Sequence, residues 1–374
     1  MVCYITSCLI LNTWSAFILM CWPLLQVSTG IPSLDAVLGG GLPLGTLFLL
    51  EEDDHASYSE FFLRCFLAEG VAVGHETFVA SLDKNPINII KKLPSPLIVN
   101  NNENRSESHG NATKPEENMK IAWRYEQKKK HSNEISSLQI GHNFDLKTDM
   151  SDEMLSAAEK FVWGGVEKSY SYAQNKSTNP YRELFMDLNT LLTRRHLIAG
   201  NKRAQPNIMR IGIHSLASYS WGNELNLQTE DAAWSELTTF LTLLHALLRE
   251  SYSVAFVSVP SHRFEDYNLM HRLSKSCDFV LGLESFQGTD KEVNPLFKDY
   301  HGLLKISKTC SLNSVVPPII NTKDWVFQVK RKRLLIEKLY LPPDLSETVS
   351  RSSSDPIKSS FMGCSSGGSS KLDF

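Results

Sequence analysis

Short apolar segments alternate with amphipathic helical segments along most of this chain, and no other feature constrains the fold as strongly. Parallel strands need a crossover connection, usually a helix, so this alternation is typical of βαβ units. We therefore predict an α/β fold whose mostly parallel, twisted sheet carries helices on both faces. The predicted strands are 46–50, 77–81, 208–213, 254–259 and 278–283, and the predicted helices are 59–69, a short helix from Asn85-Pro86, 181–198 and 236–249.

The last third of the patterned region lacks these helices. Residues 301–307, 325–330 and 334–341 read as strands that follow one another directly. Consecutive strands without a crossover pair as antiparallel hairpins. An antiparallel C-terminal extension of the sheet is therefore expected.

Composition changes divide the chain into regions. We predict one α/β domain over residues 27–345, a disordered insertion at about 98–137, and a flexible Ser-rich tail over 346–374. The insertion is polar and Asn-rich, which is typical of segments that cannot bury enough apolar surface to order themselves. Its exception is MKIAWRY at 119–125, an aromatic and basic segment suited to docking.

The first 34 residues carry no charged side chain, and Asp35 is the first. Three interpretations of residues 1–26 stay open. A secretory signal requires a basic n-region, and residues 1–10 contain no basic residue. A membrane anchor requires about 20 consecutive apolar residues, and here polar residues and Pro23 interrupt the apolar stretch. The third is a misassigned gene start that adds foreign sequence to the genuine chain.

Overall charge and cysteine usage exclude some classes of protein. The formal net charge is −3, which argues against a strongly basic nucleic-acid coat but not against a local basic patch. The 7 cysteines form no C-x-x-C pair, so neither a zinc site nor a disulfide framework is indicated. These features favour a reduced intracellular protein without a metal site.

The loop after the first strand occupies the position of a P-loop, between a strand and a helix. A working P-loop holds phosphates with glycine N–H groups and a Lys, and magnesium with a Ser or Thr. Here residues 51–59 read EEDDHASYS, with no glycine, Tyr58 at the Lys position, and Ser59 keeping the hydroxyl. We interpret it as a degenerate nucleotide loop and a solvated acidic turn or docking surface, although its acids could instead chelate a divalent cation. The acids are Glu51, Glu52, Asp53 and Asp54.

The position at which a magnesium-binding acid is expected, at the end of a later strand, is occupied by other residue types. Strand 208–213 ends in His214 and Ser215 where an Asp is expected. A histidine there could act as a base, but a surface or packing role is the commoner one. Asp83 could activate water or simply form a turn. Two degenerate nucleotide-handling elements favour a pseudo-ATPase.

The segment STGIPSLDAVLGGGLPLG, at 28–45, resembles the segment that precedes the P-loop strand in RecA/KaiC-type ATPases. Further segments resemble, in order, the Elongator complex protein 4 family over about residues 27–374. They are FLAEG (66–70), MKIAWRY (119–125), IMRIG (208–212), LGLESF (281–286), NPLFKDYHGLL (294–304), LPPDLSETVSRSS (341–353) and the terminal KLDF.

This resemblance implies a RecA-like, non-catalytic subunit of the Elongator complex. Such a subunit forms a heterohexameric ring with the fifth and sixth Elongator subunits, binds tRNA, and supports carboxymethyl-type modification of wobble uridine by the catalytic Elongator core. It implies a cytoplasmic and nuclear location, and ATP at composite ring interfaces as the only cofactor. Two alternatives are an active RecA/KaiC-type ATPase with a non-standard P-loop and a membrane-tethered scaffold that uses residues 1–25.

Clusters of basic residues are the candidates for RNA contact, because arginine beside aromatic residues suits phosphate pairing and base stacking. The segments 215–234 and 261–275, which follow the third and fourth strands, are expected to face the pore of a ring. Trp163, Trp221, Trp234 and Phe286 are expected in or beside loops, as core residues or interface anchors. The candidate tRNA contacts are Arg124, Arg194, Arg195, Lys202, Arg203, Arg263, Arg272, Lys275, Lys330, Arg331, Lys332 and Arg333.

Overall fold

The computed structural model describes residues 25–97, 141–165, 168, 179–198, 207–221, 230–264, 267–310, 324–330 and 333–339. The predicted insertion, the Ser-rich tail and nearly all of segment 1–26 lie outside these residues and stay predictions. Within the described part of the chain, no helix is long and apolar enough to cross a membrane.

A mixed sheet of nine strands forms the centre of the fold, in the order β13-β12-β11-β10-β3-β9-β8-β4-β7. Strands β10 to β7 in this order are parallel, while β11, β12 and β13 continue the sheet in antiparallel fashion. The predicted fold class is therefore confirmed, including the antiparallel extension. The strands are β3 (Leu47–Glu51), β4 (Glu76–Ser81), β7 (Lys160–Gly164), β8 (Met209–Ile213), β9 (Ser253–Val259), β10 (Phe279–Ser285), β11 (Gly302–Lys308), β12 (Trp325–Lys330) and β13 (Arg333–Lys338).

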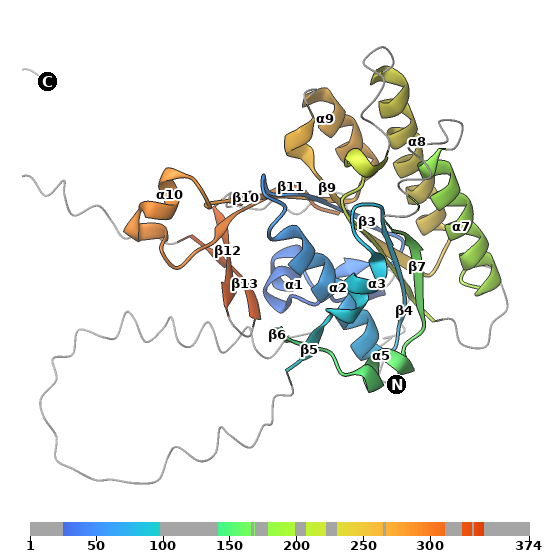
Figure 1. The fold of residues 1–374 in the computed structure, drawn as a ribbon, viewed down its shortest axis with the longest axis horizontal. Helices are drawn as coiled ribbons and strands as arrows, with labels where there is room; N and C mark the ends of the chain where they lie inside the picture. The colour runs from blue at the N-terminus through green and yellow to red at the C-terminus, as the bar shows by residue number, and fades with distance from the viewer. Residues whose placement is uncertain are drawn as a thin grey trace, which may run out of the picture. The chain divides into compact units, whose positions relative to one another are not determined.

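Helices cover both faces of the sheet, as predicted (Figure 1). On one face α1 (Pro32–Leu38), α2 (Ser59–Val73) and α3 (Pro86–Lys91) pack against Phe48, Leu50 and the other side chains that point to that side. On the opposite face α7 (Pro180–Arg194), α8 (Glu230–Arg249) and α9 (Tyr267–Ser276) cover Leu47, Leu49 and their neighbours. Successive strand residues point to opposite faces, so alternate residues of β3 enter two separate cores.

Several elements were not predicted. Strand β7 and helices α1, α5 (Asp152–Ala157) and α9 were not among the predicted elements, and the helix expected to reach Ile198 ends at Arg194. Most of segment 261–275 forms helix α9, and its expected position at the pore of a ring stays a prediction. The remaining elements are β1 (Gln26–Val27), β2 (Leu42–Pro43), β5 (Pro94–Pro96), β6 (Phe144–Asp149), α10 (Asp290–Val293) and short 3-10 turns at Tyr219–Trp221, Ser261–Arg263 and Pro295–Phe297.

Candidate functional site

The loop between β3 and α2 holds the N-terminus of α2 with a side chain of its own. The Asp53 carboxylate is buried, and it accepts hydrogen bonds from the Ser57 N–H at 2.9 Å and the Tyr58 N–H at 3.1 Å. Phosphate in a P-loop binds to N–H groups at this position, because the first amides of a helix have no partner within the helix. Here a built-in carboxylate already occupies those two donors.

Glu52 joins the ends of three parallel strands. Its buried carboxylate accepts a hydrogen bond from the Ser215 hydroxyl at 2.8 Å, while the Ser215 N–H donates to the Ser258 hydroxyl oxygen at 2.9 Å. Burial raises the pKa of Glu52, and hydrogen bonds from Ser258 and Ser215 oppose that rise. The expected solvated acidic turn is therefore wrong for Glu52 and Asp53, which are structural.

The other loop residues are divided between solvent and core. Asp54 is exposed, and Glu51, the last residue of β3, is partly buried. Tyr58, at the position of the P-loop lysine, packs edge-on against Phe327 with ring centroids 5.0 Å apart. The Ser59 hydroxyl is buried, and no hydrogen-bond partner for it lies among the described residues.

His214 follows β8, where a magnesium ligand was sought. Its side chain is buried, and within the described parts of the chain neither ring nitrogen has a hydrogen-bond partner. Burial lowers the pKa of His214 to about 4, and Lys84 contributes to this decrease. The ring is therefore neutral at pH 7. Asp83 accepts a hydrogen bond from the Ser218 hydroxyl at 2.6 Å, which ties together two loops at this edge of the sheet.

The candidate RNA contacts that the structure describes lie on several different elements. Arg195 is held by Glu76 through hydrogen bonds of 2.9 and 3.0 Å, and the Arg263 guanidinium lies 4.7 Å from the centroid of the Tyr219 ring. Arg194 ends α7, Arg272 and Lys275 lie on α9, and Lys330 pairs with Arg333 where β12 and β13 form a hairpin. Arg124, Lys202, Arg203, Arg331 and Lys332 lie outside the described residues.

The aromatic candidates for an interface are core residues in this chain. Trp163 lies in β7 rather than in a loop, and it stacks on Trp221, which in turn stacks on Tyr181. Trp163, Trp221 and Phe286 are all buried. The description of α8 does not include the side chain of Trp234. Of the two roles considered for these aromatics, the three described side chains have the core role.

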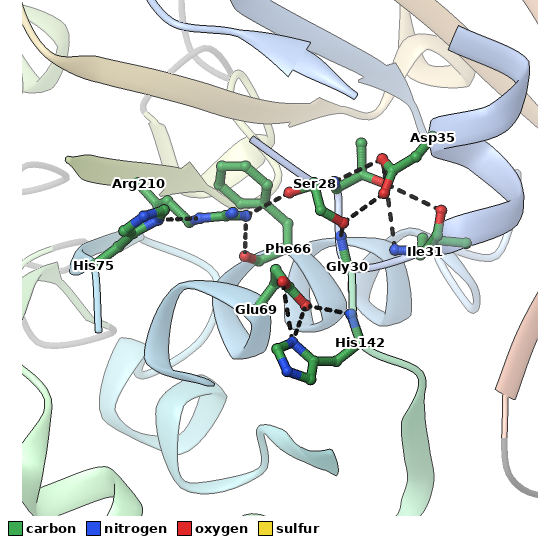
Figure 2. Close-up of polar contacts among 10 residues, drawn as sticks. Ser28, Gly30, Ile31, Asp35, Phe66, Glu69, His75, His142 and Arg210 are labelled. Carbon is green, nitrogen blue, oxygen red and sulfur yellow. Dashed lines mark hydrogen bonds and ion pairs between the residues drawn. The ribbon is translucent and has the colours of Figure 1, made fainter. Parts of the chain in front are cut away.

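A second buried cluster explains the RecA/KaiC-like segment near the N-terminus (Figure 2). Asp35 on α1 accepts hydrogen bonds from the Ser28 hydroxyl at 2.5 Å and from both the N–H and the hydroxyl of Thr29, at 2.8 and 2.7 Å. Gly30 has a φ of +78°, and a Cβ there would lie 2.2 Å from the Cys65 carbonyl oxygen. The Ser, Thr, Gly and Asp of this segment therefore take part in contacts within the fold.

Arg210 anchors this cluster from the middle of β8. Its guanidinium is buried and donates to the Ser28 and Phe66 carbonyl oxygens at 2.7 and 3.0 Å and to His75 Nδ1 at 3.1 Å (Figure 2). Burial lowers the pKa of Arg210 to about 10, while Glu69 and Asp35 raise it. Sequence analysis missed this role, because Arg210 lies within an apolar strand pattern.

Glu69, on α2, connects the cluster to the segment that follows the predicted insertion. Its buried carboxylate accepts a hydrogen bond from the His142 N–H at 3.0 Å and lies 3.2 Å from His142 Nδ1. The hydrogen bond with Glu69 raises the pKa of His142. Within the described ranges, no group of three or more His, Cys, Asp or Glu side chains is placed to hold a metal ion.

The strand order defines an α/β domain with a mostly parallel sheet, in which acidic side chains occupy the loop between β3 and α2. The profile of the PAXNEB protein family matches residues 24–374. The chain belongs to this family, whose curated relatives bear the name Elongator complex protein 4.

The similarity to these relatives extends over most of both chains. The Xenopus laevis protein is 42% identical over 94% of this chain and 89% of its own length. The human protein is 38% identical over 94% of this chain and 86% of its own length. The Danio rerio protein is 39% identical over 91% of this chain and 87% of its own length. Among solved structures, a KaiC-like protein from Pyrococcus horikoshii aligns with a TM-score of 0.42 at 13% identity, over 84% of this chain and 100% of its own.

Proposed function

We propose that this chain is the fourth subunit of an Elongator complex and forms a heterohexameric ring with the fifth and sixth subunits. In this proposal the ring binds tRNA and supports carboxymethyl-type modification of the wobble uridine, U34, by the catalytic Elongator core. The chain acts in the cytoplasm and nucleus and supplies no catalytic group of its own. The observation that carries the proposal is the relationship to Elongator complex protein 4, at 42% identity over 94% of the chain.

The loop after β3 supports a non-catalytic role. Asp53 occupies the N–H groups of Ser57 and Tyr58, the two loop residues directly before α2, and Tyr58 packs against Phe327 instead of providing a cation. A carboxylate in that place also repels a triphosphate. We therefore assign any ATP in the assembly to composite interfaces, where a neighbouring chain contributes part of the site.

The test is the native mass of the full chain co-expressed with the fifth and sixth Elongator subunits of the same organism. We expect one six-chain species that contains all three proteins. Binding of tRNA to that species, measured by mobility shift, then tests the RNA part of the proposal. A chain that stays monomeric in the presence of both partners would contradict the ring, and a ring without tRNA affinity would contradict the RNA role.

A further inference from the structure

Residues 286–301 connect β10 to β11 and form an arm that its own contacts hold together. The Phe286 and Phe297 rings pack edge to face, with centroids 5.3 Å apart. The Thr289 hydroxyl donates to the Phe286 carbonyl oxygen at 2.7 Å, and the Lys291 ammonium lies 5.5 Å from the centroid of the Phe286 ring. The arm therefore presents α10 in a defined position.

Helix α10 exposes an apolar side chain beside a carboxylate. Val293, its last residue, is 86% exposed, more than any other exposed large apolar side chain of the described residues. Asp290, its first residue, is also exposed, and its carboxylate has no ion-pair partner in the part of the chain that the structure describes. Residues three apart lie on the same face of a helix. Asp290 and Val293 therefore form one small surface.

A groove of about 370 Å³ lies between α7 and α8. Phe185, Met186, Phe240 and Leu243 line it with apolar surface, and the side chains of Met186 and Leu243 are 55% and 44% exposed. Arg182 lines the same groove one helical turn before Met186, and no ion-pair partner of its guanidinium lies among the described residues. The groove therefore places an apolar surface beside an available positive charge.

The arm and the groove lie over different strands of the sheet. The arm leaves the sheet at β10, whereas α7 and α8 directly precede β8 and β9 in the chain, and β3 lies between β10 and β9. Figure 1 shows α10 beside the antiparallel strands, far from α7 and α8. The arm of one copy is therefore not in its own groove, and both are open to a second copy.

We propose that two copies of this chain associate head to tail, with α10 of one copy in the groove between α7 and α8 of the other. The spacing supports this contact: Val293 meets Met186 while Asp290, one turn away, meets Arg182, which is one turn from Met186. An apolar centre with opposite charges at its rim is typical of protein interfaces. Head-to-tail contacts repeat from copy to copy and close into a ring where the rotation allows. Only the use of these surfaces towards other subunits in a ring rests on the proposed function.

Sedimentation velocity of the purified full chain over a range of concentrations tests the contact. We expect reversible association with a dissociation constant on the order of 100 µM, because the contact is small. Val293→Asp and Met186→Asp should each stay monomeric, since each variant lacks one half of the contact. Their equimolar mixture should form a dimer, because each variant provides the half that the other lacks. Val73→Asp changes an exposed valine on α2 and is the matched control, which should associate as the wild type does.

A charge exchange tests the same contact without changing its apolar centre. Asp290→Arg should weaken association about fivefold, because it places two positive charges together. The double variant Arg182→Asp/Asp290→Arg should restore the wild-type association.

The inference is overturned if the wild type stays monomeric at several times the expected dissociation constant, or if Val293→Asp and Met186→Asp associate as the wild type does. A mixture of these two variants that forms no dimer, or a charge exchange that restores nothing, would also overturn it. Because the chain is measured without other subunits, none of these results decides whether the proposed heterohexameric ring forms.

Discussion

Two buried polar clusters in this chain stabilise charge in opposite ways. The N-terminal cluster contains the buried Arg210 guanidinium, whose pKa the nearby charges of Glu69 and Asp35 raise. In the strand-end cluster, the partners of Glu52 and Asp53 among the described residues are hydroxyl and N–H donors. The first cluster therefore contains a full positive charge, whereas these donors of the second are dipoles. The comparison shows that acids at the P-loop position join strands and hold a helix end, and that the firmer anchor of the fold lies elsewhere.

Removing the Arg210 guanidinium should have the largest effect on stability and so distinguish the two clusters most clearly. Arg210→Met leaves the buried Ser28 and Phe66 carbonyl oxygens without their donor and removes a buried positive charge near Glu69 and Asp35, so we expect a loss of about 3–5 kcal/mol in the free energy of unfolding. Urea denaturation of the full chain measures this. Arg182→Met, at an exposed position on α7, is the matched control and should change stability by less than about 0.5 kcal/mol. A loss below about 1 kcal/mol for Arg210→Met would show that the carboxylates do not depend on it.

The strand-end cluster should be less sensitive to loss of one member. Asp53→Ala leaves the Ser57 and Tyr58 amides without their acceptor, and we expect a loss of about 2 kcal/mol. Asp54→Ala removes an equal charge from an exposed neighbour and should have almost no effect. Equal losses in the two variants would mean that general charge, and not the amide contact, matters in this loop.

His214 directly precedes Ser215 of the strand-end cluster, and we expect its side chain to lower the free energy of unfolding. Because its folded pKa of about 4 is below the unfolded value near 6.5, the unfolded state binds the proton more tightly. Stability is therefore lost as pH falls from 6.5 towards 4. His214→Leu should be about 1 kcal/mol more stable at pH 7, with a gain that grows over that window. His55→Leu, at an exposed site, should show no such growth. A variant less stable at every pH would contradict this account.

The smallest expected change in stability is at His142, and its pH dependence is opposite to that of His214. The Glu69 hydrogen bond raises its pKa, so its stabilising contribution is fully present below about pH 6.5 and is lost as pH rises through the folded pKa. The ring is half exposed, and solvent screening limits the effect to about 0.5 kcal/mol. His142→Gln should therefore be less stable than the wild type at pH 6 and almost equal at pH 8, measured by urea denaturation. A difference that is the same at both pH values would contradict the ionic part of the contact.

The sequence predicted those parts of the fold that follow from local period. Strands such as 254–259 and helices such as 59–69 carry their pattern within a few residues, and Asn85 caps α3 as expected, accepting a hydrogen bond from the Ile87 N–H. Strand β7 was missed, because its residues KFVWG have no clear alternation. The Arg210 contacts could not be predicted either: they join Arg210 to Ser28 and Phe66, which are far away in the chain, and only the fold brings these residues together.

Exchange of the Ser57 and Tyr58 amides with deuterated solvent, followed by mass spectrometry with and without MgATP, tests the central claim most directly. That claim is that the loop directly before α2 is closed to phosphate because Asp53 already binds the Ser57 and Tyr58 amides. We predict that both amides are protected in the free chain and that MgATP leaves their exchange rates unchanged. Slower exchange on addition of MgATP, lost again in Ser59→Ala, would show a phosphate site at this helix end and contradict the account.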